Sequence, residues 1–323
     1  MEANLPLQAF QEAAQLFLQT QRIVIISHRN PDADAIGANL ALREALENLG
    51  KTVVSACVDP APEDSRFLLQ GREIVHHFDP ANFDLFVSVD CGGHKVLGFH
   101  ESMPELFAQP RKAFINIDHH ASNDHFGTVN IVMPETPSTC FILYLLFGSY
   151  GWDITPNMAT AMLHGLYYDT GSFMHSNTDA QTLRIAGRLK ALGGKHERCV
   201  KELFHSTSIP RLRLWGRGME RAEFNEKGAL VTALTQKDYQ ELRTEAPDAS
   251  GLVTYLTHVQ EAPYCILLTE DKAGQIKASM RTHKEDLDLS AIAGLFGGGG
   301  HHKAAGFTIP GHLREKRIWV VTD

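Results

Sequence analysis

The sequence predicts an α/β protein of two domains, and three observations support this fold class. The chain has 323 residues, of which 43% are hydrophobic, so it can supply two cores rather than one. In the first half, short β-branched segments alternate with helical segments, which is typical of a parallel sheet with helices on both faces. In the second half, two strands flank a turn and indicate a hairpin, so we expect a smaller α/β domain with a mixed sheet.

The predicted elements of the first half follow one another in a regular order. Residues 7–20 carry apolar side chains at helical spacing, and the β-branched run Arg22–Ile26 after them indicates a buried strand. The small residues of Ala35–Leu42 then predict a packed helix. Further strands are predicted at residues 52–58, 83–89 and 113–117, and a helix with one apolar face at residues 158–168.

A helical linker is predicted between the two domains. Asp179 is a suitable N-cap for a helix whose apolar residues recur at helical spacing up to Leu192, and a boundary follows near Ile209-Pro210. We therefore divide the chain into an N-terminal domain of residues 1–185, a helical linker of residues 186–210 and a C-terminal domain of residues 211–323. In the C-terminal domain, strands are predicted at residues 229–234, 264–269 and 275–280.

Charge is distributed unevenly between the two halves. The formal net charge is −8, but residues 1–185 contain 10 Lys and Arg against 21 Asp and Glu, whereas residues 186–323 contain 20 against 17. An acidic first half suits a site that collects divalent cations, and a mildly basic second half suits one that binds phosphate groups. Unequal surface charge without any such site is the alternative.

The cysteines and the N-terminus favour a protein of the cytoplasm. The five cysteines are far apart and form no C-x-x-C pair, which is typical of reduced core thiols. Cys91 stands out because it follows Asp90. The N-terminal residues do not combine a basic region with an apolar run, and no apolar segment approaches the length that spans a membrane. We expect a cytoplasmic protein without a membrane partner.

Histidines and aspartates stand where the predicted elements end. The first strand is followed by an H-x-x-x-D-x-D motif, the next two strands end in further candidates, and the helix at 158–168 leads to another. These residues are His28, Asp32 and Asp34, then Asp90, then Asp118, His119 and His120 with Asn123 just beyond, and finally Asp169. Because the carboxyl ends of parallel strands meet at one edge of a sheet, where ligands bind, we expect these side chains to converge.

Each candidate also has an ordinary structural explanation. Asp32 or Asp34 is a suitable N-cap, and Asp90 before two glycines is a suitable start of a turn. These explanations would all have to hold independently, so one convergent site is the simpler account. Carboxylates packed together repel one another and take up protons unless cations neutralise them. The sequence therefore predicts a metal site with more than one ion.

These motifs resemble the DHH phosphoesterase superfamily, whose third signature is the run Asp118-His119-His120. The segment Phe296–Gly306 is similar to the G-G-G-H-x-x-A-A-G signature of the associated DHHA1 domain. The resemblance spans essentially the whole chain. Length and two-domain layout are most similar to the NrnA branch, which combines oligoribonuclease activity with a phosphatase activity on 3′-phosphoadenosine 5′-phosphate.

The resemblance implies a role for each residue of the first domain. Asp90, Asp169 and His120 would be catalytic, with Asp90 bridging two ions and His120 stabilising or protonating the leaving group after in-line attack by a shared water. Asp118 would orient His119 or His120 by accepting an imidazole hydrogen bond. The family prefers two Mn²⁺, with Mg²⁺ as the alternative. The implied ligands are His28, Asp32 and Asp90 for one ion, and Asp34, Asp90, His119 and Asp169 for the other.

A second group of residues is expected to bind the substrate. Arg281 leaves the predicted strand at 275–280, and its alternative role is a solvated edge residue. The glycine run after it is too short and too sharply bounded for a flexible linker, and successive glycines let backbone N–H groups converge on an anion. We predict that the following residues hold the phosphate and the nucleotide: Arg281, Gly298, Gly299, Gly300 and His301, with Asn123 as a further contact.

The implied substrates are very short RNA, such as the dinucleotide pApA, and 3′-phosphoadenosine 5′-phosphate, which would give AMP. One rival is another enzyme of the superfamily acting on cyclic dinucleotides, pyrophosphate or polyphosphate. A rival of another class is a regulatory nucleotide-binding protein, whose mark would be lost metal ligands, and none is lost here. Long duplex nucleic acid is not expected as a partner, and a homodimer is left open.

Overall fold

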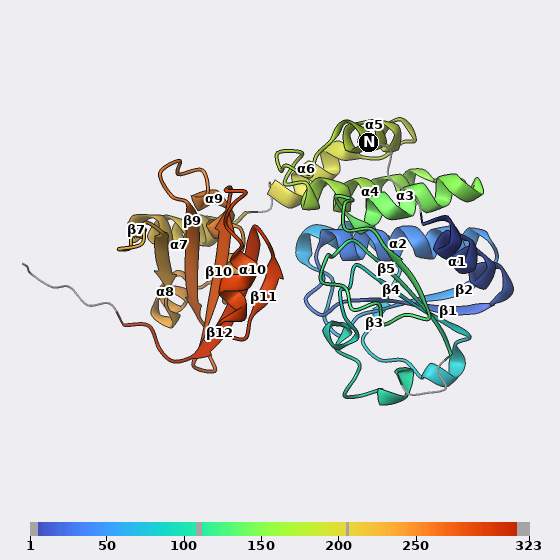
Figure 1. Ribbon diagram of the computed structural model, residues 1–323, viewed down its shortest axis with the longest axis horizontal. Helices are drawn as coiled ribbons and strands as arrows, with labels where there is room; N and C mark the ends of the chain where they lie inside the picture. The colour runs from blue at the N-terminus through green and yellow to red at the C-terminus, as the bar shows by residue number, and fades with distance from the viewer. Residues whose placement is uncertain (1–5, 108–111, 205–206, 315–323) are drawn as a thin grey trace, which may run out of the picture. The chain divides into compact units, whose positions relative to one another are not determined.

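The structure is a computed structural model that describes residues 6–107, 112–204 and 207–314 (Figure 1). The chain forms two compact units that divide between residues 206 and 207. Each unit contains one six-stranded sheet. Among the described residues, the helices fall short of the length and apolar character that crossing a membrane requires.

The sheet of the N-terminal unit is entirely parallel, with the strand order β3-β2-β1-β4-β5-β6. The chain runs from β1 outward through β2 and β3, then returns to build β4, β5 and β6 on the other side. The order therefore reverses between β1 and β4, and ligands bind outside the carboxyl ends of strands at such a point. The strands are β1 Arg22–Ser27, β2 Thr52–Ala56, β3 Ile74–Val75, β4 Leu85–Val89, β5 Ala113–Asp118 and β6 Val129–Val132.

Helices cover both faces of this sheet, as predicted, but the two faces differ. One face packs on α-helices through a large aliphatic core that includes Ile23, Ile25 and Leu42. The other face packs on one-turn 3-10 helices and loops through a phenylalanine-rich core. The α-helices of this unit are α1 Leu7–Gln19, α2 Ala33–Asn48, α3 Thr139–Tyr150, α4 Pro156–Asp169, α5 Ala180–Ala191 and α6 His196–Phe204, and the 3-10 helices opposite are η2 Pro80–Asn82, η3 His94–Leu97 and η4 Pro104–Leu106.

Helices α2 and α4 cross closely because each has a glycine at the contact. A Cβ atom on Gly37 would lie 2.4 Å from the carbonyl oxygen of Ala161, and one on Gly165 would lie 2.5 Å from Oδ1 of Asp34. Real Cβ contacts are longer, so larger residues would push the helices apart. This close crossing brings the start of α2 against the C-terminal half of α4.

A buried histidine in α4 makes the N-terminal unit sensitive to acid. His164 is fully buried, its Nε2 lies 3.2 Å from Oγ of Ser65, and its Nδ1 has no hydrogen-bond partner within the described ranges. Burial lowers the pKa of His164 to about 4 from its ordinary 6.5. The unfolded chain therefore takes up a proton below pH 6.5 that the folded chain refuses until about pH 4. Stability is lost as pH falls through this window.

We expect the parent protein to lose about 2 kcal/mol more unfolding free energy between pH 7 and pH 5 than a His164→Asn variant. Urea denaturation of both proteins in chelator, at the two pH values, measures the difference. His77 is exposed in the same unit, so His77→Asn serves as the control and should follow the parent. Equal losses in the parent and in His164→Asn would contradict a neutral buried imidazole.

The C-terminal unit has a mixed sheet of strand order β11-β12-β10-β9-β8-β7, which confirms the predicted class. Strands β8 and β9 are parallel and the remaining pairs are antiparallel. The predicted hairpin is formed by β9 and β10. The strands are β7 Glu223–Phe224, β8 Leu230–Leu234, β9 Tyr264–Glu270, β10 Gln275–Thr282, β11 Gly299–His301 and β12 Ala304–Pro310, and the α-helices are α7 Ile209–Glu220, α8 Gln236–Leu242, α9 Leu252–Leu256 and α10 Leu289–Gly294.

Candidate metal centre

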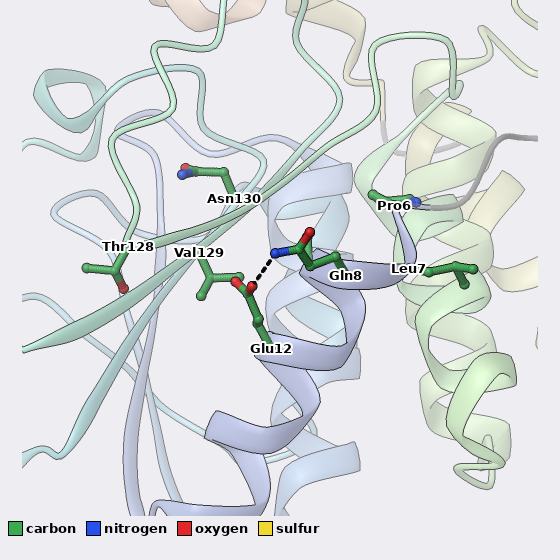
Figure 2. Close-up of a pocket in the computed structure, with 8 residues that line it drawn as sticks. Pro6, Leu7, Gln8, Glu12, Thr128, Val129 and Asn130 are labelled. Carbon is green, nitrogen blue, oxygen red and sulfur yellow. Dashed lines mark hydrogen bonds between the residues drawn. The ribbon is translucent and has the colours of Figure 1, made fainter.

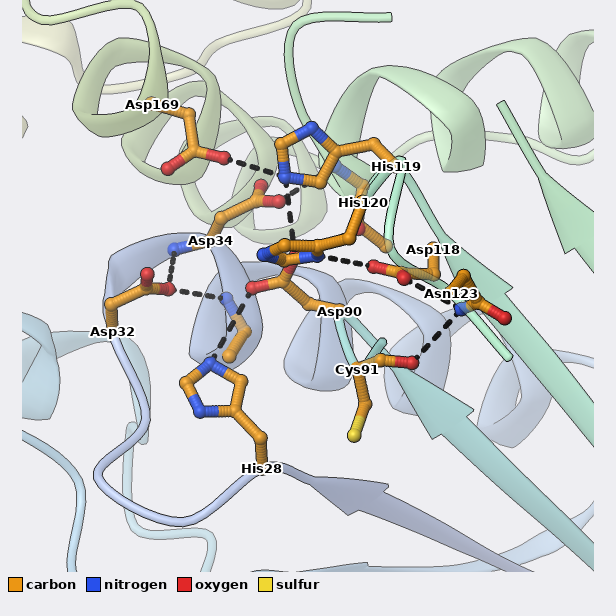
Figure 3. A network of polar contacts seen from close by, with 12 residues as sticks. His28, Asp32, Asp34, Asp90, Cys91, Asp118, His119, His120, Asn123 and Asp169 are labelled. Atoms are coloured by element: carbon orange, nitrogen blue, oxygen red, sulfur yellow. Dashed lines mark hydrogen bonds and ion pairs between the residues drawn. The ribbon is translucent and has the colours of Figure 1, made fainter. Parts of the chain in front are cut away.

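The structure brings the predicted site residues of the first domain together at the carboxyl edge of the parallel sheet (Figure 3). His28 follows β1, Asp90 follows β4, and His119 and His120 follow β5, whose last residue is Asp118. The start of α2 and the end of α4 complete the site with Asp32, Asp34 and Asp169. The site therefore lies at the point where the strand order reverses.

Asp32 caps a helix and also faces the site. Its Oδ1 accepts hydrogen bonds from the backbone N–H groups of Asp34 and Ala35, both at 3.0 Å, at the N-terminus of α2. Its carboxylate also lies within reach of His28 and Asp90 in one candidate ligand group. The two explanations that the sequence left open for Asp32 are therefore compatible, because one oxygen suffices for the cap.

Asp90 occupies the centre of the site. Its backbone is in the left-handed region, with φ of 58°, a conformation that Asp tolerates better than most residues. Its side chain is only 2% exposed. Its Oδ2 lies 3.6 Å from Nε2 of His28, and its Oδ1 lies 3.5 Å from Nε2 of His119 and 3.8 Å from Nδ1 of His120. The two oxygens of one carboxylate thus face different histidines.

Within the described part of the chain, three groups of residues have ligand atoms close enough to hold a metal ion. All three include Asp90, and two of them are the same sets that the family resemblance implies for two neighbouring ions. The third overlaps with them. The groups are His28, Asp32 and Asp90; Asp34, Asp90, His119 and Asp169; and Asp90, His119 and His120.

The protonation of these groups reflects their crowding. Burial, together with repulsion from Asp90 and Asp169, raises the pKa of Asp32 to about 7 and raises that of Asp34 well above its usual range. The pKa of Asp90 is instead lowered, because the surrounding imidazoles outweigh its burial. Burial opposes protonation of His28, but the nearby Asp90 carboxylate outweighs burial and raises the pKa of His28 to about 9. Without metal, bound protons thus neutralise the crowded carboxylates. Divalent cations would take over this role.

His120 is oriented by a chain of hydrogen bonds. Its Nδ1 lies 2.7 Å from Oδ1 of Asp118, which is fully buried. Nδ2 of Asn123 donates to the other oxygen of Asp118 at 2.6 Å and to the carbonyl oxygen of Cys91 at 3.1 Å. Asp118 therefore accepts from an imidazole as its proposed orienting role requires. The amide of Asn123, predicted to contact substrate, holds Asp118 in place.

The N-terminus of α3, which is not among the elements predicted from the sequence, also supports the site. Ser138 caps this helix, and the backbone N–H groups of Thr139 and Cys140 donate to Asp34 at 2.6 and 3.1 Å. The hydroxyl of Thr139 donates to Oδ1 of Asp90 at 3.1 Å. Ser138 before an apolar run is an N-cap signal that could have located the helix.

A pocket of about 440 Å³ lies away from this chemistry, between the start of α1 and strand β6 (Figure 2). It is lined by residues 6–9, Glu12 and residues 128–130, and its polar contact is a hydrogen bond of 2.9 Å from Gln8 to Glu12. Its lining shares no residue with the candidate ligand groups. The catalytic candidates are therefore identified by side-chain chemistry rather than by cavity size.

Most of the predicted substrate-binding residues of the C-terminal unit lie on two strands, β10 and β11, which are separated by β12. Arg281 is on β10 opposite Ala304 of β12, and Gly299, Gly300 and His301 form β11 at the edge of the sheet. The glycine run is thus partly an edge strand rather than an irregular loop. Residues 299–301 of this edge strand are exposed.

Matches to family models cover most of both units. The model of the DHH family, N-terminal domain, matches residues 22–166, and the model of the DHHA1 domain matches residues 227–318. A *Thermus thermophilus* protein described as a bifunctional oligoribonuclease and PAP phosphatase NrnA is 32% identical over 96% of this chain and 93% of its own length. A *Bacillus subtilis* protein of the same description is 25% identical, over 89% of each chain.

A solved structure shares the fold over nearly the whole chain. It is an exopolyphosphatase-related protein from *Bacteroides fragilis*, with a TM-score of 0.87 and 23% identity over 98% of this chain and 94% of the other. The motifs, the two matched domains and the relatives that align along almost their full length agree with one another. The chain therefore belongs to the DHH family, as an NrnA-like member in which a DHHA1 domain follows the DHH domain.

Proposed function

We propose that the chain is a metal-dependent hydrolase that cuts phosphoester bonds in very short RNA, such as pApA, and converts 3′-phosphoadenosine 5′-phosphate to AMP. The observation that carries this proposal is the carboxylate of Asp90, which belongs to both implied ligand groups and would hold two ions side by side. Paired ions suit in-line attack on phosphorus. The NrnA relatives support the choice of substrates. The five free, buried cysteines support a reducing compartment such as the cytoplasm.

The donor set fits two Mn²⁺, with Mg²⁺ as the alternative. Each implied group combines one imidazole with carboxylates, and such oxygen-rich sets suit these ions better than zinc. Burial raises the pKa of the Cys91 thiol, whose Sγ donates to the carbonyl of Gly93, so no thiolate competes here. When bound, the ions would supply an acidified water as nucleophile and neutralise charge on the phosphate oxygens.

The protein's own groups would position the substrate and move the proton. His120 is the proposed general acid: Asp118 accepts the hydrogen bond from Nδ1–H and fixes the ring, and the protonated imidazole would give its second proton, on Nε2, to the leaving oxygen. Oδ2 of Asp169 lies 3.2 Å from Nε2 of His119, so both atoms would be ligands of the same ion. In the C-terminal unit, Arg281, the glycines Gly298 to Gly300 and His301 would bind a substrate phosphate and its nucleotide.

We expect Arg281→Ala to reduce kcat/KM on dinucleotides by roughly ten- to a hundredfold, because a charge-assisted phosphate contact contributes about 1.5 to 3 kcal/mol. The Mn²⁺ content should be unchanged. Lys277 is exposed on the same strand, four residues away, so Lys277→Ala is the matched control and should behave as the parent. An Arg281→Ala enzyme with parental kcat/KM would remove Arg281 from the substrate site.

The proposed function is tested by assaying the purified protein with Mn²⁺ on a dinucleotide, 3′-phosphoadenosine 5′-phosphate, cyclic di-adenylate, pyrophosphate and RNA of more than 20 nucleotides. We expect turnover of the first two and much slower cleavage of the long RNA. Preferential turnover of cyclic di-adenylate or pyrophosphate would assign the chain to another activity of the superfamily. Nucleotide binding without turnover of any substrate would identify a regulatory protein.

A further inference from the structure

The bridging role proposed for Asp90 depends on how its carboxylate is rotated. One oxygen must face the His28 group and the other the His119 group, and the structure shows this arrangement. The three imidazole nitrogens lie 3.5 to 3.8 Å from the carboxylate oxygens, which is longer than a good hydrogen bond. They therefore attract the carboxylate by charge but fix its rotation weakly.

The hydroxyl of Thr139 makes a direct contact with this carboxylate. Its Oγ1 donates to Oδ1 of Asp90 at 3.1 Å, and both side chains are buried. A hydrogen bond to one oxygen on a defined side resists rotation about the carboxylate axis. The other oxygen is then directed toward His28, which lies 3.6 Å away.

Thr139 is itself held firmly. It is the first residue of α3, after the N-cap Ser138, and α3 packs into the aliphatic core through Phe141 and Ile142. Its backbone N–H donates to Oδ2 of Asp34 at 2.6 Å. One residue thus contacts the carboxylates of both implied ion sites, through its backbone and its hydroxyl. The positive end of the helix also favours these two negative groups.

We propose that Thr139 is a positioning residue of the metal centre, whose hydroxyl sets the rotation of the Asp90 carboxylate so that each oxygen faces one ion. The inference rests on the two-ion site proposed above. Hydrogen-bond partners of metal ligands typically contribute 10- to 100-fold to metal affinity or activity. The loss of this hydroxyl should therefore weaken ion binding without any change in the ligands themselves.

The test compares Thr139→Val, which keeps the size and branching of the side chain, with Thr139→Ser, which keeps the hydroxyl. Mn²⁺ is titrated calorimetrically into each chelator-stripped protein. We expect Thr139→Val to bind Mn²⁺ about 10- to 100-fold more weakly than the parent, and Thr139→Ser to stay close to the parent. Turnover of a dinucleotide at saturating Mn²⁺ is the second measurement. If the Asp90 carboxylate rotates when the hydroxyl is lost, kcat should fall in Thr139→Val but not in Thr139→Ser.

Thr160→Val is the matched control. Thr160 is a buried threonine of α4 whose hydroxyl donates to the carbonyl of Pro156 at 2.7 Å, and it contacts none of the candidate ligands. Its loss should lower stability while leaving Mn²⁺ affinity unchanged. If Thr139→Val does not fold, the pair Thr139→Ser and Thr139→Ala replaces it, because both leave the same gap for the methyl group and they differ by the hydroxyl.

The outcomes separate this inference from the function on which it rests. Parental Mn²⁺ affinity and kcat in Thr139→Val, or equal affinities in the Ser and Ala variants, would overturn the role of the hydroxyl while the metal centre stands. Weakened binding in both Thr139→Val and Thr139→Ser would also overturn it and point to packing instead. A parent protein that binds no Mn²⁺ would overturn the metal centre and this inference together.

Discussion

Asp90→Asn is expected to reduce turnover of dinucleotides at least about a thousandfold, a loss of roughly 4 kcal/mol of transition-state stabilisation. Asn keeps the size of Asp but loses the charge and one strong ligand oxygen. Because Asp90 belongs to both implied ion groups, the change should weaken both ions rather than one. Activity and bound Mn²⁺, measured by elemental analysis after desalting, report the two losses.

A matched control separates the bridge from general damage to the loop. Asp124 lies in the loop after β5, at the same edge of the sheet as Asp90. Its side chain is 48% exposed, and it belongs to none of the candidate ligand groups. Asp124→Asn should therefore retain parental activity and metal content. Circular dichroism and urea denaturation establish that both variants fold. A folded Asp90→Asn protein with near-parental activity would refute the two-ion proposal.

Sequence alone could predict the sheet and the convergence of the site, because both follow from local patterns. The runs 22–26, 83–89 and 113–117 are predicted as strands, and they form the neighbouring parallel strands β1, β4 and β5, with β4 beginning at Leu85. Once their order is known, His28 and Asp90 must meet, since they leave the carboxyl ends of adjacent strands. Residues far apart in the sequence are thus brought together because their strands are neighbours in the sheet.

Support for the site from distant segments could not be predicted in the same way. The N-terminus of α3 reaches Asp34 across about a hundred residues of sequence, through backbone N–H groups that every residue but proline carries. Gly165 likewise admits Asp34 because it has no Cβ. The residue types do not reveal these contacts, because they depend on how α3 and α4 pack against α2.

Some residues have two compatible roles, and the sequence pattern does not show that both apply. Asp32 is both an N-cap and a candidate ligand, so the choice between the two was not a real alternative. Asn123, predicted to contact substrate, donates its amide to Asp118, and its contact with substrate stays a prediction. The glycine run shows a third case, since residues 299–301 form an edge strand while keeping backbone groups at the surface.

Removal of the metal is expected to abolish activity, and its return should distinguish between ions. After treatment with chelator, turnover of a dinucleotide should fall to background, then recover best with Mn²⁺, less with Mg²⁺ and poorly with Ca²⁺. Ca²⁺ is larger and prefers six to eight oxygen ligands. It should therefore bind poorly to two compact sites that each contain one imidazole. Full activity in chelator would contradict the metal assignment.

Stability should report the same ions independently of turnover. The metal-free site crowds Asp32, Asp34 and Asp169 together, and burial with mutual repulsion raises the pKa of each carboxyl. Divalent cations would relieve this repulsion, so Mn²⁺ at a hundred times its dissociation constant should stabilise the N-terminal unit by about 2.7 kcal/mol for each ion bound. Thermal unfolding with and without Mn²⁺ measures the effect, and Asp90→Asn should show little of it. Ions and protons compete for the same ligands, and the pKa of the ligand His28 is raised to about 9. The stabilisation should therefore shrink as pH falls from 8.5 to 6.5. A Mn²⁺-induced shift that is equal at the two pH values, or equal in Asp90→Asn, would mean that the ions bind elsewhere on the chain.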